Sequence, residues 1–214
     1  MSSLIEKEDL VVVILAGGQS IRMGKNIFKP VVKLEGKPLL LYVYRNLQKL
    51  SSEVLVIVKS EHQKELIKKL INDNKIKVIV DSFEFSSPLA GILTAAQNTT
   101  KEVLVPVGAD QIFLSQSVIA NLLSHMDNQS DAIVPRWPNG YIEPLGAVYK
   151  RIAIDRFIKN NFDINEVSLH WFLQNISVKY VDIFSITDTP ELTYFNINTL
   201  NDLKKAKSVL SRIS

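Results

Sequence analysis

A glycine-rich, basic loop follows the first apolar run of the chain, with the sequence LAGGQSIRMGK at residues 15–25. Gly17 and Gly18 let the backbone approach a ligand closely, because neither residue has a Cβ atom. Successive exposed amides in such a loop form a concave site for an anion. Three positive charges strengthen this attraction: Arg22, Lys25 and Lys29. The sequence therefore predicts a loop that binds phosphate groups.

Two well-known phosphate-binding patterns do not fit this loop. The Walker pattern requires glycine where Gln19 stands and serine or threonine where Asn26 stands. The dinucleotide-binding pattern separates its first two glycines by one residue, whereas Gly17 and Gly18 are adjacent. The loop therefore belongs to another class of phosphate site; the alternative is a basic loop that binds no ligand.

Two aspartates stand directly after apolar runs that have the composition of buried strands. Asp110 follows the run VLVPVGA at residues 103–109, and Asp81 follows the run IKVIV at residues 76–80. In an open α/β sheet, the carboxyl ends of the strands face the crevice that binds ligands. Mg2+ takes one or two protein carboxylates and completes its shell with water and phosphate oxygens. We therefore predict Asp110 as a ligand of Mg2+; the alternative for either aspartate is a turn or capping role.

Short apolar runs alternate with longer stretches of helical periodicity along the chain. Strands are predicted at residues 10–15, 54–58, 76–80, 103–107, 132–135, 145–149, 178–183 and 193–197. Helices are predicted at residues 38–50, 61–72, 88–97, 152–160, 167–175 and 200–210, with one more from Ser115 or Ser117 to about His125. The pattern predicts an α/β fold: a three-layer, Rossmann-like, mostly parallel sheet with helices on both faces.

The bulk composition excludes several classes of protein. Hydrophobic residues make up 46% and charged residues 22% of the chain, as in ordinary globular proteins. The absence of cysteine excludes disulfides, thiolate zinc sites and cysteine nucleophiles. A net charge of +3 without a basic cluster argues against a nucleic-acid partner. No apolar run approaches the ~18 residues that span a bilayer, so we expect a cytoplasmic protein with no membrane partner.

The loop sequence LAGGQSIRMG at residues 15–24 resembles the signature loop of the molybdenum cofactor guanylyltransferases, within the MobA-like nucleotidyltransferase superfamily. The likeness continues in the family's order over nearly the whole chain: GKPL at residues 36–39, Asp81, PLAG at 88–91, GAD at 108–110 and FNINT at 195–199. The loop and the later aspartate are typical of the superfamily, and FNINT is the segment that most favours the molybdenum branch. The resemblance implies a fold of the nucleotide-diphospho-sugar transferase type.

The resemblance also implies roles for individual residues. Those expected to bind the nucleotide are Leu15, Ala16, Gly17, Gly18, Lys29, Asp81 and Asp110. Those expected to be catalytic are Arg22, Lys29 and Asp110, with Mg2+ bound to Asp110. The family has one lysine after Arg-Met-Gly, whereas Lys25 and Lys29 are both available here. We prefer Lys29, because Lys29-Pro30 leads into the next strand-like run as the family lysine does.

One position departs from the family pattern. Family members often place an asparagine at the end of the second strand, where it meets the base or the ribose, but this chain has Val58 and then Lys59. A contact with the base at this point must therefore use the backbone or a side chain of different character. The choice between guanine and another base stays open.

Candidate acceptor-binding residues lie in the C-terminal half. Asn196 and Asn198 alternate with apolar residues, so both side chains would point to one face of a strand. The resemblance implies that this face binds the acceptor; the alternative is a turn residue and a helix cap. The segment Glu143-Pro144-Leu145-Gly146 is a further candidate for the acceptor, and Trp171-Phe172 is assigned to core packing.

No linker interrupts the chain, so we predict one domain over residues 1–214, with a nucleotide-binding half at about 8–126 and an acceptor-binding half at about 127–214. The resemblance implies transfer of GMP from GTP to the phosphate of molybdopterin, with release of pyrophosphate. It also implies transient contact with other cofactor-biosynthesis proteins or with molybdoenzymes. The alternatives are CTP as donor, or cobinamide phosphate, phospholactate or a sugar phosphate as acceptor. An alternative of another class is a nucleotide-binding module without turnover.

Overall fold

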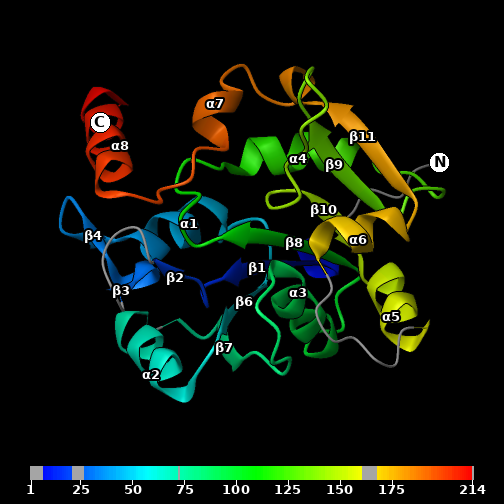
Figure 1. Ribbon diagram of the computed structural model, residues 1–214, viewed down its shortest axis with the longest axis horizontal. Coiled ribbons are helices and arrows are strands. Elements are labelled where there is room, and N and C mark those ends of the chain that lie inside the picture. Colours follow the sequence, from blue (N-terminus) through cyan, green and yellow to red (C-terminus); the bar gives the residue numbers. More distant parts are fainter. Residues whose placement is uncertain (1–6, 21–26, 72, 161–167, 214) are drawn as a thin grey trace.

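Seven strands form one central sheet in the computed structural model, which describes residues 7–20, 27–71, 73–160 and 168–213 (Figure 1). Their order across the sheet is β11-β9-β10-β8-β1-β6-β7. Neighbouring strands run parallel except at β10, which is antiparallel to both β8 and β9. The prediction of an α/β fold with a mostly parallel sheet is therefore confirmed.

The strands of this sheet are β1 (Leu10–Leu15), β6 (Glu53–Val58), β7 (Ile76–Val80), β8 (Val103–Gly108), β9 (Ala132–Arg136), β10 (Val148–Lys150) and β11 (Val178–Asp182). Two short antiparallel pairs join β2 (Gln19–Ser20) to β3 (Ile27–Phe28) and β4 (Lys33–Leu34) to β5 (Lys37–Pro38). The α-helices are α1 (Leu39–Leu47), α2 (Glu61–Leu70), α3 (Pro88–Gln97), α4 (Gln116–Ser124), α5 (Arg151–Asn160), α6 (Leu169–Gln174), α7 (Pro190–Thr193) and α8 (Leu200–Ile213). Short 3-10 helices are η1 (Lys7–Asp9), η3 (Lys29–Val31) and η4 (Ile183–Ser185). Predicted and observed bounds coincide for β1, β7 and α3.

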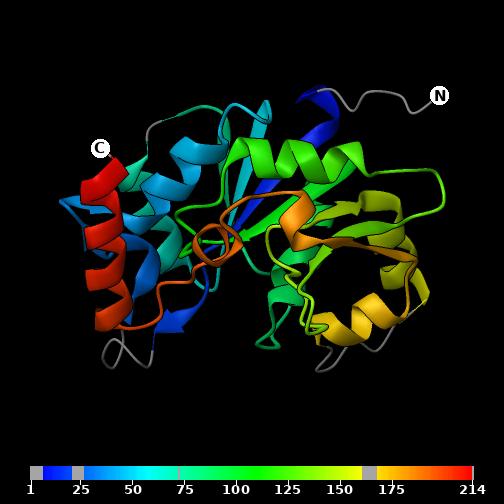
Figure 2. The same ribbon diagram turned by 90° about the horizontal axis from the view of Figure 1, so that it is seen from above.

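Helices cover both faces of the sheet and complete three layers. One face packs against α1, α2 and α4 through a cluster that includes Val12 and Ile14 of β1. The other face packs against α3, α5 and α6 through a cluster that includes Val11 and Val13. Alternate side chains of β1 thus point to opposite faces, as the two-residue period of a strand requires. Figure 2 shows α4 on one side of the sheet and α6 on the other.

The two central strands end at the same edge of the sheet. All residues of β8, and all of β1 except Leu15, are buried, which explains their continuous apolar runs. Leu15 pairs with Gly108, and Ala109 N donates to Leu15 O at 3.2 Å just beyond the pair. The chain leaves β1 toward β6 on one side and later returns to β8 on the other side. Open α/β sheets bind ligands at such a divergence of connections.

The predicted strand at residues 193–197 is wrong. These residues hold the end of α7 and an irregular segment that leads to α8. Pro190 begins α7 because its fixed φ suits the first helical turn, and Tyr194 N then donates to Pro190 O. Tyr194 and Ile197 are buried. Their apolar character therefore reflects the burial of irregular backbone and not the period of a strand.

Other predicted elements differ from the structure only in extent; the helix predicted at residues 38–50, for example, is α1 (Leu39–Leu47). The strand predicted at residues 145–149 begins at Val148, because Gly146 has a φ of 82°, which a strand cannot contain. The N-terminus of α8 is capped by Thr199: Thr199 Oγ1 accepts from Asp202 N, and Asp202 Oδ2 accepts from Thr199 N. Within the described parts of the chain, no helix is long and apolar enough to cross a membrane.

Tyr149 joins the buried sheet to the segment that precedes it. Its side chain is wholly buried, and its hydroxyl donates to Pro144 O at 2.7 Å. Burial raises the pKa of the Tyr149 hydroxyl above its ordinary value, so this group stays protonated and keeps donating. The hydrogen bond therefore anchors residues 143–146 against the strand.

Replacing this hydroxyl tests the anchor. We expect Tyr149→Phe to lower the free energy of unfolding by about 1–2 kcal/mol, because the partly buried Pro144 carbonyl loses its donor. Urea denaturation followed by tryptophan fluorescence measures the change. The matched control is Tyr180→Phe on β11, whose ring is 40% exposed and whose change we expect to stay within about 0.5 kcal/mol. Equal stabilities of the two variants would contradict the anchoring role.

Candidate functional site

A cavity of about 580 Å³ lies at the carboxyl ends of β1, β6 and β8, and we call it the loop cavity. Its lining includes every residue predicted to bind a nucleotide: Leu15, Ala16, Gly17, Gly18, Lys29, Asp81 and Asp110. The fold thus brings the whole of this predicted set to one place. Arg22 and Lys25, the other predicted cations of the loop, lie outside the described residues.

An ion pair between Lys29 and Asp110 forms part of the cavity wall. Lys29 Nζ lies 2.7 Å from Asp110 Oδ2, and the side chains are 14% and 15% exposed. The same ammonium group donates to Asn198 Oδ1 at 2.8 Å. Partial removal from water strengthens the attraction between the two charges. Three segments that are far apart in the sequence therefore meet at one nitrogen atom.

Local structure fixes both members of this pair. Lys29 begins η3, whose buried Pro30 restricts the backbone directly after it, and Val32 N donates to Lys29 O at 3.0 Å. Asp110 follows β8, where a Cβ atom on Gly108 would lie only 2.5 Å from Asp110 Oδ1. Glycine at this position therefore leaves the space that the carboxylate occupies. Gly108 N also donates to Gln111 Oε1 at 2.7 Å, which holds the turn after the strand.

The donor set around Asp110 fits a magnesium ion that is shared with a ligand. No group of three or more acidic or histidine side chains that could hold a metal occurs among the described residues. Asp110 offers one carboxylate, and the amide oxygen of Asn198 accepts from Lys29, the same lysine that donates to Asp110. Mg2+ commonly takes one or two protein carboxylates and fills its other positions with water and phosphate oxygens. The site therefore suits a cation that arrives with phosphate, and does not suit a closed protein cage.

Asp81 is the centre of a second hydrogen-bond network in the loop cavity. Its side chain is 3% exposed. Oδ1 accepts from Thr94 Oγ1 at 2.6 Å and from Phe83 N at 3.1 Å, and Oδ2 accepts from Lys59 Nζ at 2.8 Å. The bond to Phe83 N is the turn interaction considered as an alternative for this aspartate. Asp81 thus holds the segment after β7 in place at the edge of the cavity.

Lys59 is a site residue for which no role was predicted from the sequence. It follows β6 at the position where the family pattern departs, and it lines the loop cavity. Besides Asp81, its ammonium group donates to Phe85 O at 3.1 Å. A Cβ atom on Gly17 would lie 2.7 Å from Lys59 Cγ, so the glycine lets the loop pack directly on the lysine stem. The departure from the family's asparagine at this point was the signal in the sequence that could have identified Lys59. The hydrogen-bond partners of Lys59 are visible only in the fold.

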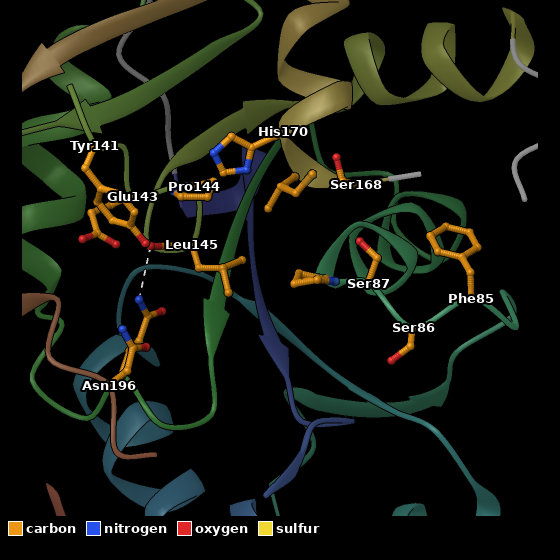
Figure 3. A pocket seen from close by; sticks show the side chains of 13 residues that line it. Phe85, Ser86, Ser87, Tyr141, Glu143, Pro144, Leu145, Ser168, His170 and Asn196 are labelled. Atoms are coloured by element: carbon orange, nitrogen blue, oxygen red, sulfur yellow. Dashed lines mark hydrogen bonds between the residues drawn. The ribbon is translucent and has the colours of Figure 1, made fainter. Parts of the chain in front are cut away.

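A second cavity of about 590 Å³ adjoins the first, and we call it the C-terminal cavity (Figure 3). The two cavities share Ser86, Ser87, Pro88 and Leu145 in their linings. Figure 3 shows Tyr141 and Glu143 on one side, Phe85 and Ser87 on the other, and His170 at the upper edge. The N-terminus of α3 therefore separates two adjoining spaces.

The two predicted acceptor asparagines do not share a strand face, because the segment that contains them is irregular. Asn196 lines the C-terminal cavity, and its Nδ2 donates to Tyr194 O at 3.0 Å. Asn198 instead accepts the hydrogen bond from Lys29. Glu143 also lines the C-terminal cavity, and its Oε1 accepts from Trp137 Nε1 at 2.9 Å. The two asparagines thus reach different parts of the combined site.

Comparison with known proteins gives consistent matches over most of the chain. The family model of the MobA-like NTP transferase domain matches residues 12–162. A protein of Pyrococcus furiosus named probable molybdenum cofactor guanylyltransferase is 32% identical over 199 residues, which cover 92% of this chain and 96% of that protein. A protein of the same name from Pyrococcus horikoshii is 33% identical, with coverage of 91% and 97%. The crystal structure of molybdopterin-guanine dinucleotide biosynthesis protein A from Archaeoglobus fulgidus has a TM-score of 0.74 at 24% identity, covers 94% of this chain and 99% of that one, and shows the same fold.

The network around Asp81 makes a measurable contribution to stability. We expect Thr94→Val, a change of nearly constant volume at a wholly buried position, to lower the free energy of unfolding by about 1–2 kcal/mol, because Asp81 Oδ1 loses a donor. Urea denaturation gives the value. Thr100→Val is the control, since Thr100 is exposed, and we expect a change within about 0.5 kcal/mol. A loss confined to the control would show that Thr94 does not support Asp81.

Proposed function

The chain belongs to the MobA-like NTP transferase family and is therefore a nucleotidyltransferase, and on that premise we propose that it transfers GMP from GTP to the phosphate of molybdopterin. The second product is pyrophosphate. The names of the two Pyrococcus relatives, which match nearly the full length of this chain, support this donor and this pathway. The proposed reaction uses a nucleoside triphosphate, so we place it in the cytoplasm.

The observation that carries the proposal is the contact of Lys29 with both Asp110 and Asn198. Lys29 and Asp110 lie at the loop cavity, whereas Asn198 belongs to the segment that also supplies Asn196 to the C-terminal cavity. A reaction between two phosphorylated substrates needs both to meet at one charged point. In this proposal the loop cavity takes GTP, the C-terminal cavity takes the acceptor, and the transfer occurs between them.

We assign the first half of the chain, about residues 8–126, to the nucleotide and the second half, about 127–214, to the acceptor. The backbone of residues 15–18 borders the loop cavity and would hold the triphosphate there. Lys29 has three N–H donors, of which Asp110 and Asn198 take two. None of the other described residues accepts from the third donor, which would bind a phosphate oxygen. Arg22 is expected to add a further cation from outside the described part of the chain.

The chemistry is an in-line displacement that needs no covalent intermediate. A phosphate oxygen of the acceptor attacks the α-phosphorus of GTP, the bond to the β-phosphate oxygen breaks, and pyrophosphate leaves. Catalysis of this kind depends on alignment and on neutralising negative charge. Asp110, with the amide oxygen of Asn198 beside it, would hold Mg2+, which supplies positive charge to the phosphate oxygens. Lys29 stabilises the same charge from the side of η3.

A screen of donors and acceptors tests the proposed function. The purified protein is incubated with Mg2+ and each of GTP, CTP and ATP, against molybdopterin, phospholactate, cobinamide phosphate and a sugar phosphate. We expect release of pyrophosphate with GTP and molybdopterin, at least tenfold faster than with any other pair. Faster release of pyrophosphate with CTP than with GTP would show that the donor base is cytosine and not guanine. Nucleotide binding without pyrophosphate release from any donor–acceptor pair would identify a nucleotide-binding protein without catalytic activity.

Substitution of the charged pair tests the mechanism. We expect Asp110→Ala and Lys29→Ala each to lower turnover by at least about two orders of magnitude, the usual scale for a group that stabilises charge in the transition state. Pyrophosphate release measures turnover, and circular dichroism checks that the fold is intact. Lys33→Ala is a matched control, because Lys33 is exposed on β4 close in sequence to Lys29 and should keep full activity. Full activity of Asp110→Ala would refute the assignment.

A further inference from the structure

The charges of the site are divided unequally between the two cavities. The described lining of the loop cavity holds two lysines and three carboxylates: Lys29, Lys59, Asp81, Glu84 and Asp110. The described lining of the C-terminal cavity contains no lysine or arginine, and Glu143 is its one carboxylate. Within this described lining, an acceptor phosphate meets no lysine or arginine side chain. The C-terminal cavity is therefore suited to the uncharged body of the acceptor, with the phosphate directed toward Lys29.

Glu143 is held in place by backbone contacts, and its carboxylate can still accept hydrogen bonds from a ligand. Its backbone N donates to Pro135 O at 2.9 Å, and Tyr149 anchors the next residue through Pro144 O. Oε1 accepts from Trp137 Nε1, while none of the described residues donates to Oε2. A carboxylate offers about four lone-pair sites, so most of its capacity remains available. Burial raises the pKa of Glu143, and the hydrogen bond from the Trp137 indole opposes this effect.

We propose that Glu143 determines acceptor specificity by binding the amino-oxo edge of a pterin ring. This edge presents an N–H and an adjacent NH2 group, two parallel donors that match the two oxygens of one carboxylate. Such paired, charge-assisted bonds are strong and directional. The proposal rests on the proposed function, since it identifies the part of molybdopterin that the C-terminal cavity holds.

The walls of the cavity suit a planar heterocycle. Phe85 and Tyr141 stand on opposite sides of the space, with His170 at its edge (Figure 3). Aromatic faces bind flat rings by stacking, and do so without adding charge. Because the cavity shares Ser87 and Leu145 with the loop cavity, a substituent on the far side of the ring can extend toward Lys29 and Asp110.

The same carboxylate selects against the other acceptors. Phospholactate carries a carboxylate of its own, which Glu143 would repel in a cavity whose described lining has no lysine or arginine. A sugar phosphate offers hydroxyl groups but no paired N–H donors, so it would leave Glu143 incompletely satisfied. A site built for paired donors rejects a ligand that lacks them, because its own buried polar groups then stay unpaired.

Two small pteridines that differ only at this edge test the proposal on the full protein. The probes are 6-hydroxymethylpterin and 6-hydroxymethyllumazine, in which an oxo group replaces the 2-amino group. Dissociation constants are measured by ring fluorescence in the presence of GTP and Mg2+. We expect the wild-type protein to bind the pterin at least tenfold more tightly than the lumazine. In Glu143→Gln, whose amide adds a donor where an acceptor is needed, we expect the ratio to fall below about threefold.

The controls separate a local effect from a failure to fold. Glu191→Gln changes an exposed glutamate on α7 and should keep the wild-type ratio. Affinity for GTP should be unchanged in Glu143→Gln, which shows that the loop cavity is intact. In steady-state assays the variant should raise the KM for molybdopterin at least tenfold and change kcat by less than about threefold.

The outcomes for the inference and for the proposed function are distinct. Equal binding of pterin and lumazine by the wild-type protein, or an unchanged ratio in Glu143→Gln, would overturn the role of Glu143 even if GMP transfer to molybdopterin is observed. Selective pterin binding that is lost in Glu143→Gln supports the role even if the donor proves to be CTP. Failure of the wild-type protein to release pyrophosphate with molybdopterin bears on the proposed function alone.

Discussion

The Lys29–Asp110 ion pair is the contact that makes a single site out of distant parts of the chain. Lys29 and Asp110 are 81 positions apart, and Asn198, the second acceptor of the same ammonium group, is 169 positions from Lys29. Each member is placed by a different element: η3, the end of β8, and the irregular segment before α8. A charge with one partner missing would be costly in this half-buried position. The pair therefore couples the positions of η3, the sheet and the C-terminal segment.

The second network gives the opposite wall of the loop cavity its shape. Asp81 accepts from Thr94, Phe83 N and Lys59, so it ties α3, the segment after β7 and the end of β6 together. With these partners its carboxylate is largely satisfied by the protein itself. Lys59 is likewise engaged with Asp81 and with backbone carbonyls. Both residues border the cavity, and their first physical effect is to fix the backbone at its edge.

The unequal distribution of charge follows from the topology. The loop cavity lies at the divergence of β1 and β8, where strand ends and loop amides gather polar groups. The C-terminal cavity lies between the α3 terminus, the β9–β10 connection and α6, elements that contribute mainly apolar and neutral side chains. One carboxylate in such surroundings has a large influence on which ligand fits, because few other groups can compensate for it. Charge attraction thus dominates binding in the loop cavity, whereas shape and paired hydrogen bonds dominate binding in the C-terminal cavity.

The sequence alone determined the parts of this protein that depend on local pattern. The bounds of β1, β7 and α3 follow from apolar period and from proline at a helix start, and the loop at residues 15–18 and Asp110 are recognisable because each stands directly after a strand. Tertiary structure decided what depends on contacts between distant residues. Apolar alternation at residues 193–197 suggested a strand, yet Tyr194 and Ile197 are buried on irregular backbone. Asn196 therefore lines the C-terminal cavity, whereas Asn198 accepts a hydrogen bond from Lys29. The partners of Lys29, Lys59 and Glu143 also come from other elements, and no local pattern encodes them because hydrogen bonds and ion pairs form between atoms that only folding brings within about 3 Å.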